Sequence, residues 1–298
     1  MSSDNGYDKK SHGFLRNIVR LVHADVVKLS HYWVILAGYA AMVGIALLGA
    51  YLTYHAEQAV AIKSGSGYAF AISLVIRCID FGAPILYVMI CILFAIEVSN
   101  STIKYIITRP VRRIELMLSK YVTAMLMILV AFLIFWAVGM ATGWYYYGLG
   151  DLTENEYVIF SAGYMVKEIA VGTLFMLIPF AALAAMALMV STFSSTMGGS
   201  IIIGLILYFF FQILGLIPNS LGITVNWGGE EHMFPYMTLG FPSQRFVPMY
   251  MLDELPTGIE IATWWTWDIQ KMIFICSVFF AIFFTVSIIE ARKRDFTL

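Results

Sequence analysis

A charged stretch with a proline interrupts two long apolar runs between residues 97 and 120, where the sequence reads EVSNSTIKYIITRPVRRIELMLSK. The stretch opens with an acid, continues with a basic run around one proline and closes with a lysine: Glu97, Arg109, Pro110, Arg112, Arg113 and Lys120. Proline disfavours helical geometry at the preceding residue, so a short helix capped by the Ser-Asn-Ser-Thr group would end before it. The chemistry predicted here is ion pairing, because a compact basic helix between two apolar runs can dock a soluble partner.

Other spacings in the chain give little support for catalysis. Gly148-Leu149-Gly150-Asp151 matches a string of intramembrane aspartyl proteases, in which two aspartates share a proton. Here it falls in an acidic loop, and no partner string accompanies it. Neither HExxH, GxSxG nor a Gly-Lys dipeptide occurs anywhere in the chain. The sequence therefore predicts no catalytic or metal-binding residues, no bound cofactor and no ATP hydrolysis by this chain alone.

A protein that presents such a charged stretch must first keep its apolar surface away from water. Of the 298 residues, 60% are hydrophobic and 12% are charged, which excludes an ordinary soluble domain. A helix needs about 20 apolar residues to cross the hydrocarbon core of a bilayer. Runs of that length predict an all-α, polytopic membrane protein, a single transmembrane domain over 1–298, with six spans near 33–53, 69–96, 116–143, 169–190, 199–217 and 272–289.

Lysine and arginine are concentrated in alternate loops. Thirteen of the eighteen fall in the N-terminal segment, between the second and third apolar runs, or in the C-terminal tail. Because cytoplasmic loops hold these residues in excess, both termini and the 97–115 loop are predicted to be cytoplasmic, in the cell inner (plasma) membrane. No basic tract indicates nucleic acid as a partner.

Two segments outside the spans have patterns of their own. Residues 14–31 carry apolar residues at helical spacing between basic ones, which predicts an interfacial helix that lies on membrane lipids. The 218–271 segment between spans five and six is too rich in aromatic residues for a linker. We expect an extracytoplasmic segment of short helices or re-entrant turns packed at the outer leaflet.

Ionisable residues inside the spans are few. Arg77 and Asp80 are three residues apart, on one face of the second span, which predicts an intramembrane polar pair. Asp80 precedes Glu97 by about 25 Å at helical rise, so the pair would lie toward the outer end of the span. A structural ion pair and side chains that reach for the interface are alternatives to a functional site there.

The charged stretch also resembles a family signature. Its acid at Glu97, the Ser101-Thr102 pair, the turn at 109–113 and Lys120 are similar to the cytoplasmic loop of ABC (ATP-binding cassette) type-2 exporter permeases. In that family the loop forms a coupling helix that docks on a separate ATP-hydrolysing subunit.

The resemblance implies roles for single residues of this coupling loop. Glu97 and Thr102 would shape the loop, and Pro110 would set its turn. Arg109, Arg112 and Arg113 would face the ATPase. An alternative for each arginine is simple anchoring on the cytoplasmic side of the membrane.

The resemblance further implies a transport subunit rather than an enzyme. A second permease subunit, in a homodimer or heterodimer, would complete the pathway, and two copies of an ATPase that binds ATP and Mg would drive export. The cargo would be a lipid, a hydrophobic peptide, a drug or an ion. Two other functions stay open, an ion-driven secondary transporter and a membrane anchor subunit of a larger complex.

Overall fold

The computed structural model describes residues 6–60, 65–99, 113–154, 157–220, 224–227, 230–233 and 241–293. Its α-helices are α1 (Gly6–Ser30), α2 (Trp33–Val60), α3 (Gly67–Ser99), α5 (Arg113–Tyr147), α6 (Ala162–Phe193), α7 (Met197–Ser220), α8 (Phe246–Asp253) and α9 (Trp267–Lys293). Shorter elements are the 3-10 helices η2 (Phe241–Arg245) and η3 (Leu255–Thr257) and the strands β1 (Leu152–Glu154), β2 (Tyr157–Phe160), β3 (Thr224–Trp227) and β4 (Glu230–Met233).

Six of the described helices, α2, α3, α5, α6, α7 and α9, are long and apolar enough to cross a membrane. The predicted all-α fold with six spans is therefore confirmed. The helices run further than the apolar stretches in the sequence, because backbone hydrogen bonds continue after the side chains become polar. Two small antiparallel hairpins, β1–β2 and β3–β4, were not predicted.

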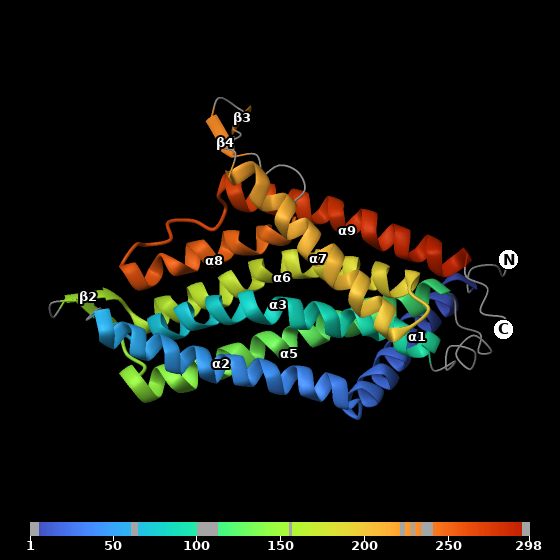
Figure 1. Cartoon of the computed structure of the whole chain (residues 1–298), viewed down its shortest axis with the longest axis horizontal. Helices are drawn as coiled ribbons and strands as arrows, with labels where there is room; N and C mark the ends of the chain where they lie inside the picture. Colours follow the sequence, from blue (N-terminus) through green and yellow to red (C-terminus); the bar gives the residue numbers. More distant parts are fainter. Residues whose placement is uncertain are drawn as a thin grey trace.

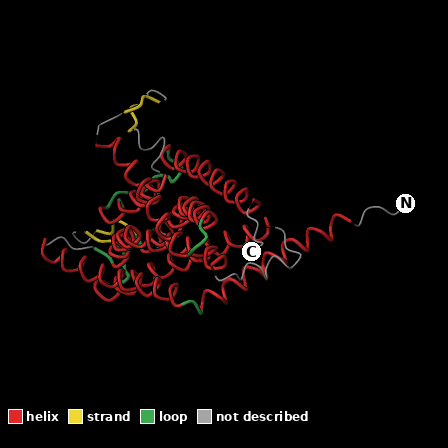
Figure 2. The backbone as a smooth tube through the Cα atoms, turned by 45° about the vertical axis from the view of Figure 1, so that its right-hand side comes forward, coloured by secondary structure: helices red, strands yellow, loops and turns green. Residues whose placement is uncertain are grey.

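The spans lie side by side along the long axis of the molecule (Figure 1). The start of α1 and the end of α9 lie at one end, which we call the terminal end. The β1–β2 hairpin lies at the opposite end, which we call the hairpin end. Figure 2 shows α1 projecting beyond the bundle and meeting α2 at a short turn. Helix α1 covers the range in which an interfacial helix was expected, and its contact with lipid stays a prediction.

Helix α3 is the centre of the bundle and packs against α2, α5, α6 and α7. Small residues let α3 and α5 approach closely at the hairpin end. A Cβ atom added at Gly143 of α5 would lie 2.3 Å from the carbonyl oxygen of Gly67 in α3, so only glycine fits there. The Gly67 N–H also donates to the carbonyl of Gly148, which adopts a φ of 74° in the turn after α5.

The segment after α7 re-enters the bundle. The ring of Phe241, at the start of η2, stacks on Phe279 with 4.5 Å between the centroids, and it also contacts Phe283 and Phe211. Because Phe279 lies near the middle of α9, η2 reaches well inside the spans. Helix α8 then runs beside α6 (Figure 1). The short helices η2, α8 and η3 fall in the 218–271 segment, and the position of that segment at the outer leaflet stays a prediction.

Candidate functional site

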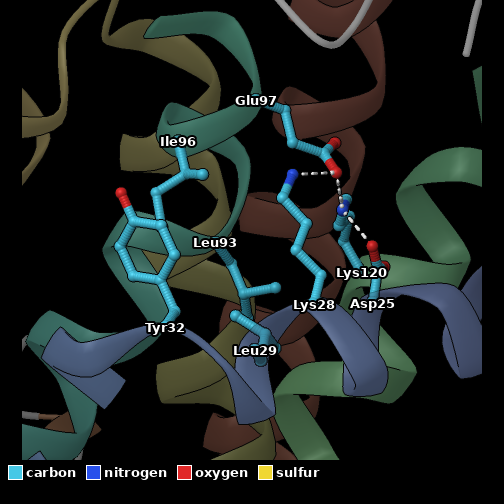
Figure 3. Close-up of a pocket in the computed structure, with 8 residues that line it drawn as sticks. All are labelled: Asp25, Lys28, Leu29, Tyr32, Leu93, Ile96, Glu97 and Lys120. Atoms are coloured by element: carbon cyan, nitrogen blue, oxygen red, sulfur yellow. Dashed lines mark hydrogen bonds and ion pairs between the residues drawn. The ribbon is translucent and has the colours of Figure 1, made fainter. Parts of the chain in front are cut away.

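Four charged residues from three helices meet at the terminal end of the bundle. The Lys120 ammonium of α5 lies 2.7 Å from Asp25 Oδ1 of α1 and 2.8 Å from Glu97 Oε1 of α3. Lys28 of α1 approaches the same Glu97 oxygen at 3.2 Å. We call Asp25, Lys28, Glu97 and Lys120 the terminal-end cluster, and Figure 3 shows their side chains converging between the three helices.

The terminal-end cluster is removed from water on most sides. The side chains of Lys120 and Glu97 are each 2% exposed, whereas that of Lys28 is 35% exposed. Leu29, Tyr32, Leu93 and Ile96 line the same small cavity with apolar groups (Figure 3). An ion pair in such surroundings is strongly destabilised when one partner is lost, because the other charge stays buried. The cluster therefore behaves as one unit rather than as independent surface pairs.

The charges balance within the terminal-end cluster, since two acids face two lysines. Burial raises the pKa of Asp25, an effect that the neighbouring Lys120 ammonium opposes and the Glu97 carboxylate adds to. Two carboxylates around one ammonium group offer no acid–base pair aimed at a substrate. In the described part of the chain, no group of three or more His, Cys, Asp and Glu side chains could hold a metal ion. What this geometry does is fix α1, α3 and α5 relative to one another.

Helix α3 has an unusual set of hydrogen bonds just before Glu97. The Ser191 hydroxyl of α6 accepts from the backbone N–H groups of Phe94 and Ala95, at 3.1 and 3.0 Å. The Ser200 hydroxyl of α7 donates to the carbonyl of Cys91 at 2.6 Å. Side chains inserted among the backbone groups of a helix are a common cause of bending. Residues 91–95 of α3 therefore have alternative partners on α6 and α7.

Arg113 and Glu115, the first charged residues of α5, also contact other helices. The Arg113 guanidinium donates to the carbonyls of Ala291, at 3.2 Å, and Arg292 at the end of α9. A cation at a helix C-terminus satisfies free carbonyls and interacts favourably with the helix dipole. Glu115 accepts a hydrogen bond of 3.4 Å from Asn17 of α1. Arg113, predicted to face an ATPase, thus holds the end of α9.

The other residues predicted for the coupling loop divide into two groups. Glu97 lies in the terminal-end cluster, buried between helices. Thr102, Arg109, Pro110 and Arg112 lie outside the described residues. Their predicted roles stay predictions.

The structure does not bring Arg77 and Asp80 together. Arg77 donates to the Thr53 hydroxyl of α2 at 3.2 Å, whereas Asp80 Oδ1 lies 3.6 Å from a guanidinium nitrogen of Arg245 in η2. Helical spacing places both residues on one face of α3, but partners on other elements are better placed for each of them.

Asp25 and Lys28 were not identified as site residues from the sequence. A signal was present, because Asp25 follows Ile18 and Val22 on the apolar stripe of α1 and precedes Leu29 on the same stripe. An acid on the buried face of a helix requires a cation from a neighbouring element. Lys120 was noted as part of a motif, but nothing in the sequence indicated that its partner is on α1.

Comparison with known proteins gives one match. The model of the family described as ABC-2 family transporter protein matches residues 21–220, more than half of the chain. No match to the chain is found among curated proteins. The matched range includes the terminal-end cluster and five of the six spans. The chain belongs to the ABC-2 transporter family, and it is a multi-pass membrane subunit of an ABC transporter.

Proposed function

We propose that this subunit forms part of an ATP-driven exporter and that the terminal-end cluster passes movement of a docked ATPase to the spans. The observation that supports this most strongly is the double contact of Lys120. Its ammonium group bonds both Asp25 of α1 and Glu97 of α3. Glu97 is two residues from the end of α3, immediately before the 100–112 loop.

The position of the terminal-end cluster explains how movement of the loop would reach the spans. Helix α3 ends at Ser99 and α5 begins at Arg113, so these helices carry the two ends of the loop. The Lys120–Glu97 pair joins the helices about half a turn from the end of α3 and about two turns from the start of α5. A force on the loop would therefore move α3, α5 and α1 together, as in a rigid-body transition between two packed states.

The remaining partners follow from the same proposal. The terminal end, with both termini, faces the cytoplasm of the cell, and the membrane is the inner (plasma) membrane. Two ATPase copies bind ATP and Mg, and a second permease subunit completes the pathway. ABC-2 permeases generally work with an ABC ATPase subunit, which supports the first of these partners.

Docking on the loop can be tested by co-purification and ATP hydrolysis. The tagged permease should retain an ATPase from its native membrane, and Arg109→Glu should weaken that retention by reversing a charge at the predicted interface. Lys167→Glu is the matched control, because Lys167 is 72% exposed on α6 and far from the loop along the chain. An ATPase that is never retained, or one retained equally well by the Arg109→Glu variant, would contradict docking at this loop.

Coupling through the cluster needs a variant that keeps the helices packed. The triple change Asp25→Asn, Glu97→Gln and Lys120→Gln removes all three charges at nearly constant volume, and neutral replacements of a buried ion cluster are often tolerated. The ATPase should still co-purify, but stimulation of its ATP hydrolysis by the permease should fall at least about fivefold, the lower range of typical coupling free energies. Lys167→Gln should leave stimulation unchanged. Full stimulation by the triple variant would refute coupling through the cluster.

One observation favours a second function, an ion-driven secondary transporter. Such proteins carry ionisable groups inside the spans, and Asp80 and Arg245 form a pair of this kind. Sealed vesicles that contain only the permease should then move cargo under an imposed proton or sodium gradient without nucleotide. Absence of gradient-driven flux, together with ATP-dependent flux in the complex, would remove this alternative.

A further inference from the structure

Arg245 is a buried cation inside the spans, at the end of the segment that re-enters the bundle. It is 4% exposed, and its Nη1 donates to the Tyr208 hydroxyl of α7 at 2.8 Å. Its Nη2 lies 3.6 Å from Asp80 Oδ1 of α3. The guanidinium also lies over the Phe246 ring, 4.5 Å from its centroid. We call Asp80, Tyr208 and Arg245 the Arg245 cluster.

The Arg245 cluster joins η2 to α3 and α7. Phe241 of η2 packs on aromatic rings of α7 and α9, and these contacts have no fixed hydrogen-bond geometry. Arg245 adds directional contacts to α3 and α7 at the other end of η2. A charged side chain within the spans is unfavourable unless it is paired, so its presence is by default a sign of function.

The contacts of Arg245 are incomplete. The separation of 3.6 Å from Asp80 is too long for a hydrogen bond, and Asp80 Oδ1 accepts none in the described part of the chain. Arg245 Nε and Gln244 Oε1 are buried and also have no hydrogen-bond partner there. The Asp80 side chain is 40% exposed, so the bundle does not enclose it on all sides.

From this geometry we infer that the Arg245 cluster is a charge latch, which holds the re-entrant segment 241–253 against α3 and α7 and which opens when cargo leaves. Opening requires the separation of Arg245 from both Asp80 and Tyr208, and a shift of η2 and α8. The closed state keeps Met249 and Leu252 of that segment buried against the bundle. The link to cargo release rests on the function proposed above, whereas the latch itself does not.

Cysteine labelling can test the latch on the permease alone. The background replaces the three native cysteines, Cys78, Cys91 and Cys276, with alanine. Met249→Cys then reports on α8 through its reaction with a membrane-impermeant maleimide, because Met249 is 1% exposed in the closed state. Met165→Cys is the matched control, since Met165 is equally buried near the start of α6.

Removing the charge of Asp80 or of Arg245 should favour the open state of segment 241–253. Asp80→Asn and Arg245→Gln should each raise the labelling rate at position 249 about fivefold, which corresponds to ~1 kcal/mol. Labelling at position 165 should not change. The exchanged pair, Asp80→Arg with Arg245→Asp, should return the rate at 249 toward that of the unaltered latch. An unchanged rate in both single variants, or an equal rise at 165, would overturn the latch.

The link to transport needs the complete complex. With the co-purified ATPase, addition of ATP and Mg should raise labelling at position 249 in the unaltered latch toward the rate of Asp80→Asn. If the ATPase hydrolyses ATP and responds to the permease while the rate at 249 stays constant, release of the segment is not a step of transport. That result would leave both the coupling proposal and the latch in the isolated permease standing.

Discussion

The two buried ionic sites of the described structure differ in how completely their charges are paired. In the terminal-end cluster, Lys120 contacts two carboxylates at 2.7 and 2.8 Å, and the acids and bases are equal in number. In the Arg245 cluster, the cation lies 3.6 Å from Asp80, which is its one carboxylate partner in the described part of the chain. Both sites lie between α3 and other elements, so they act on the same central helix.

This difference separates a contact that fixes helices from a contact that can open. A buried pair with short distances resists separation, because each charge would be left alone in apolar surroundings. The Asp80–Arg245 pair, at 3.6 Å and without a hydrogen bond, has less interaction energy to lose when it separates. We therefore expect α1, α3 and α5 to move as one body and the re-entrant segment to move relative to them. Four variants can test that division.

The largest effect is expected from Lys120→Met, which leaves Asp25 and Glu97 facing each other without their shared cation. The free energy of unfolding should fall by about 3–5 kcal/mol, the loss typical of a broken buried pair. Denaturation of the purified permease in detergent measures it. Lys167→Met, which removes an exposed lysine 3.7 Å from Glu168, should change stability by about 1 kcal/mol or less. Equal losses of unfolding free energy in Lys120→Met and Lys167→Met would show that the terminal-end cluster stabilises the fold no more than an exposed ion pair does.

The loss in Lys120→Met should also depend on pH. Burial raises the pKa of Asp25, so the folded protein binds this proton more tightly than the unfolded chain does. The unfavourable free energy of the buried carboxylate is therefore greatest above the folded pKa and disappears as the pH falls through it. The difference between variant and parent should shrink in acid, and a constant difference would contradict this account.

A smaller effect is expected from Arg245→Met. The pair is long at 3.6 Å and, among the described residues, Arg245 makes one hydrogen bond, to Tyr208, so the loss of unfolding free energy should be about 1–2 kcal/mol. The same denaturation assay compares it directly with Lys120→Met. A loss as large as that of Lys120→Met would show that the two ionic sites are equally tight and would break the comparison.

Between the two sites, Ser191→Ala removes the hydroxyl that accepts from Phe94 and Ala95. Because those N–H groups can still bond within α3, stability should fall by only about 1 kcal/mol. Hydrogen exchange at Phe94 and Ala95 should nevertheless change, while exchange near Gly67 should not. Unchanged exchange at both residues would mean that Ser191 does not share their hydrogen bonds.

The smallest effect is expected from Lys28→Met. Lys28 is 35% exposed and contacts a carboxylate that Lys120 already neutralises, so the loss should be about 0.5 kcal/mol. It should also decrease when salt is added, because partly exposed charges are screened. Denaturation at low and high salt checks this, and a loss that does not respond to salt would place Lys28 among the buried members of the cluster.

The spans could be predicted from the sequence because the bilayer imposes a length of apolar residues that few soluble helices reach. The ends of the helices were less predictable. Hydropathy indicates which residues lie in the hydrocarbon core, but it does not indicate where the backbone hydrogen bonds of a helix stop. The β1–β2 hairpin after α5 was missed for a related reason. Strands of three and four residues, paired only with each other, give too short an alternation to stand out beside six long apolar runs.

Pairing across elements was the least predictable part of the sites. Arg77 and Asp80 have the right spacing for a pair, yet spacing says nothing of the residues that other helices bring near. Arg245 falls in the predicted extracytoplasmic segment 218–271, and nothing in the sequence indicated that its partners are on α3 and α7. Glu97 was identified through a motif, but its burial against Lys120 became visible only when α1, α3 and α5 were placed together.

The glycine contact between α3 and α5 has a mechanical consequence. At the hairpin end, the carbonyl of Gly67 sits where a Cβ of Gly143 would be, and at the terminal end Lys120 holds Glu97. The two helices are thus fastened near both ends of α3, whose 33 residues extend about 50 Å. A helix held against its neighbour at two distant points cannot tilt relative to that neighbour. A push applied near residue 99 would therefore displace α3 and α5 together at the hairpin end.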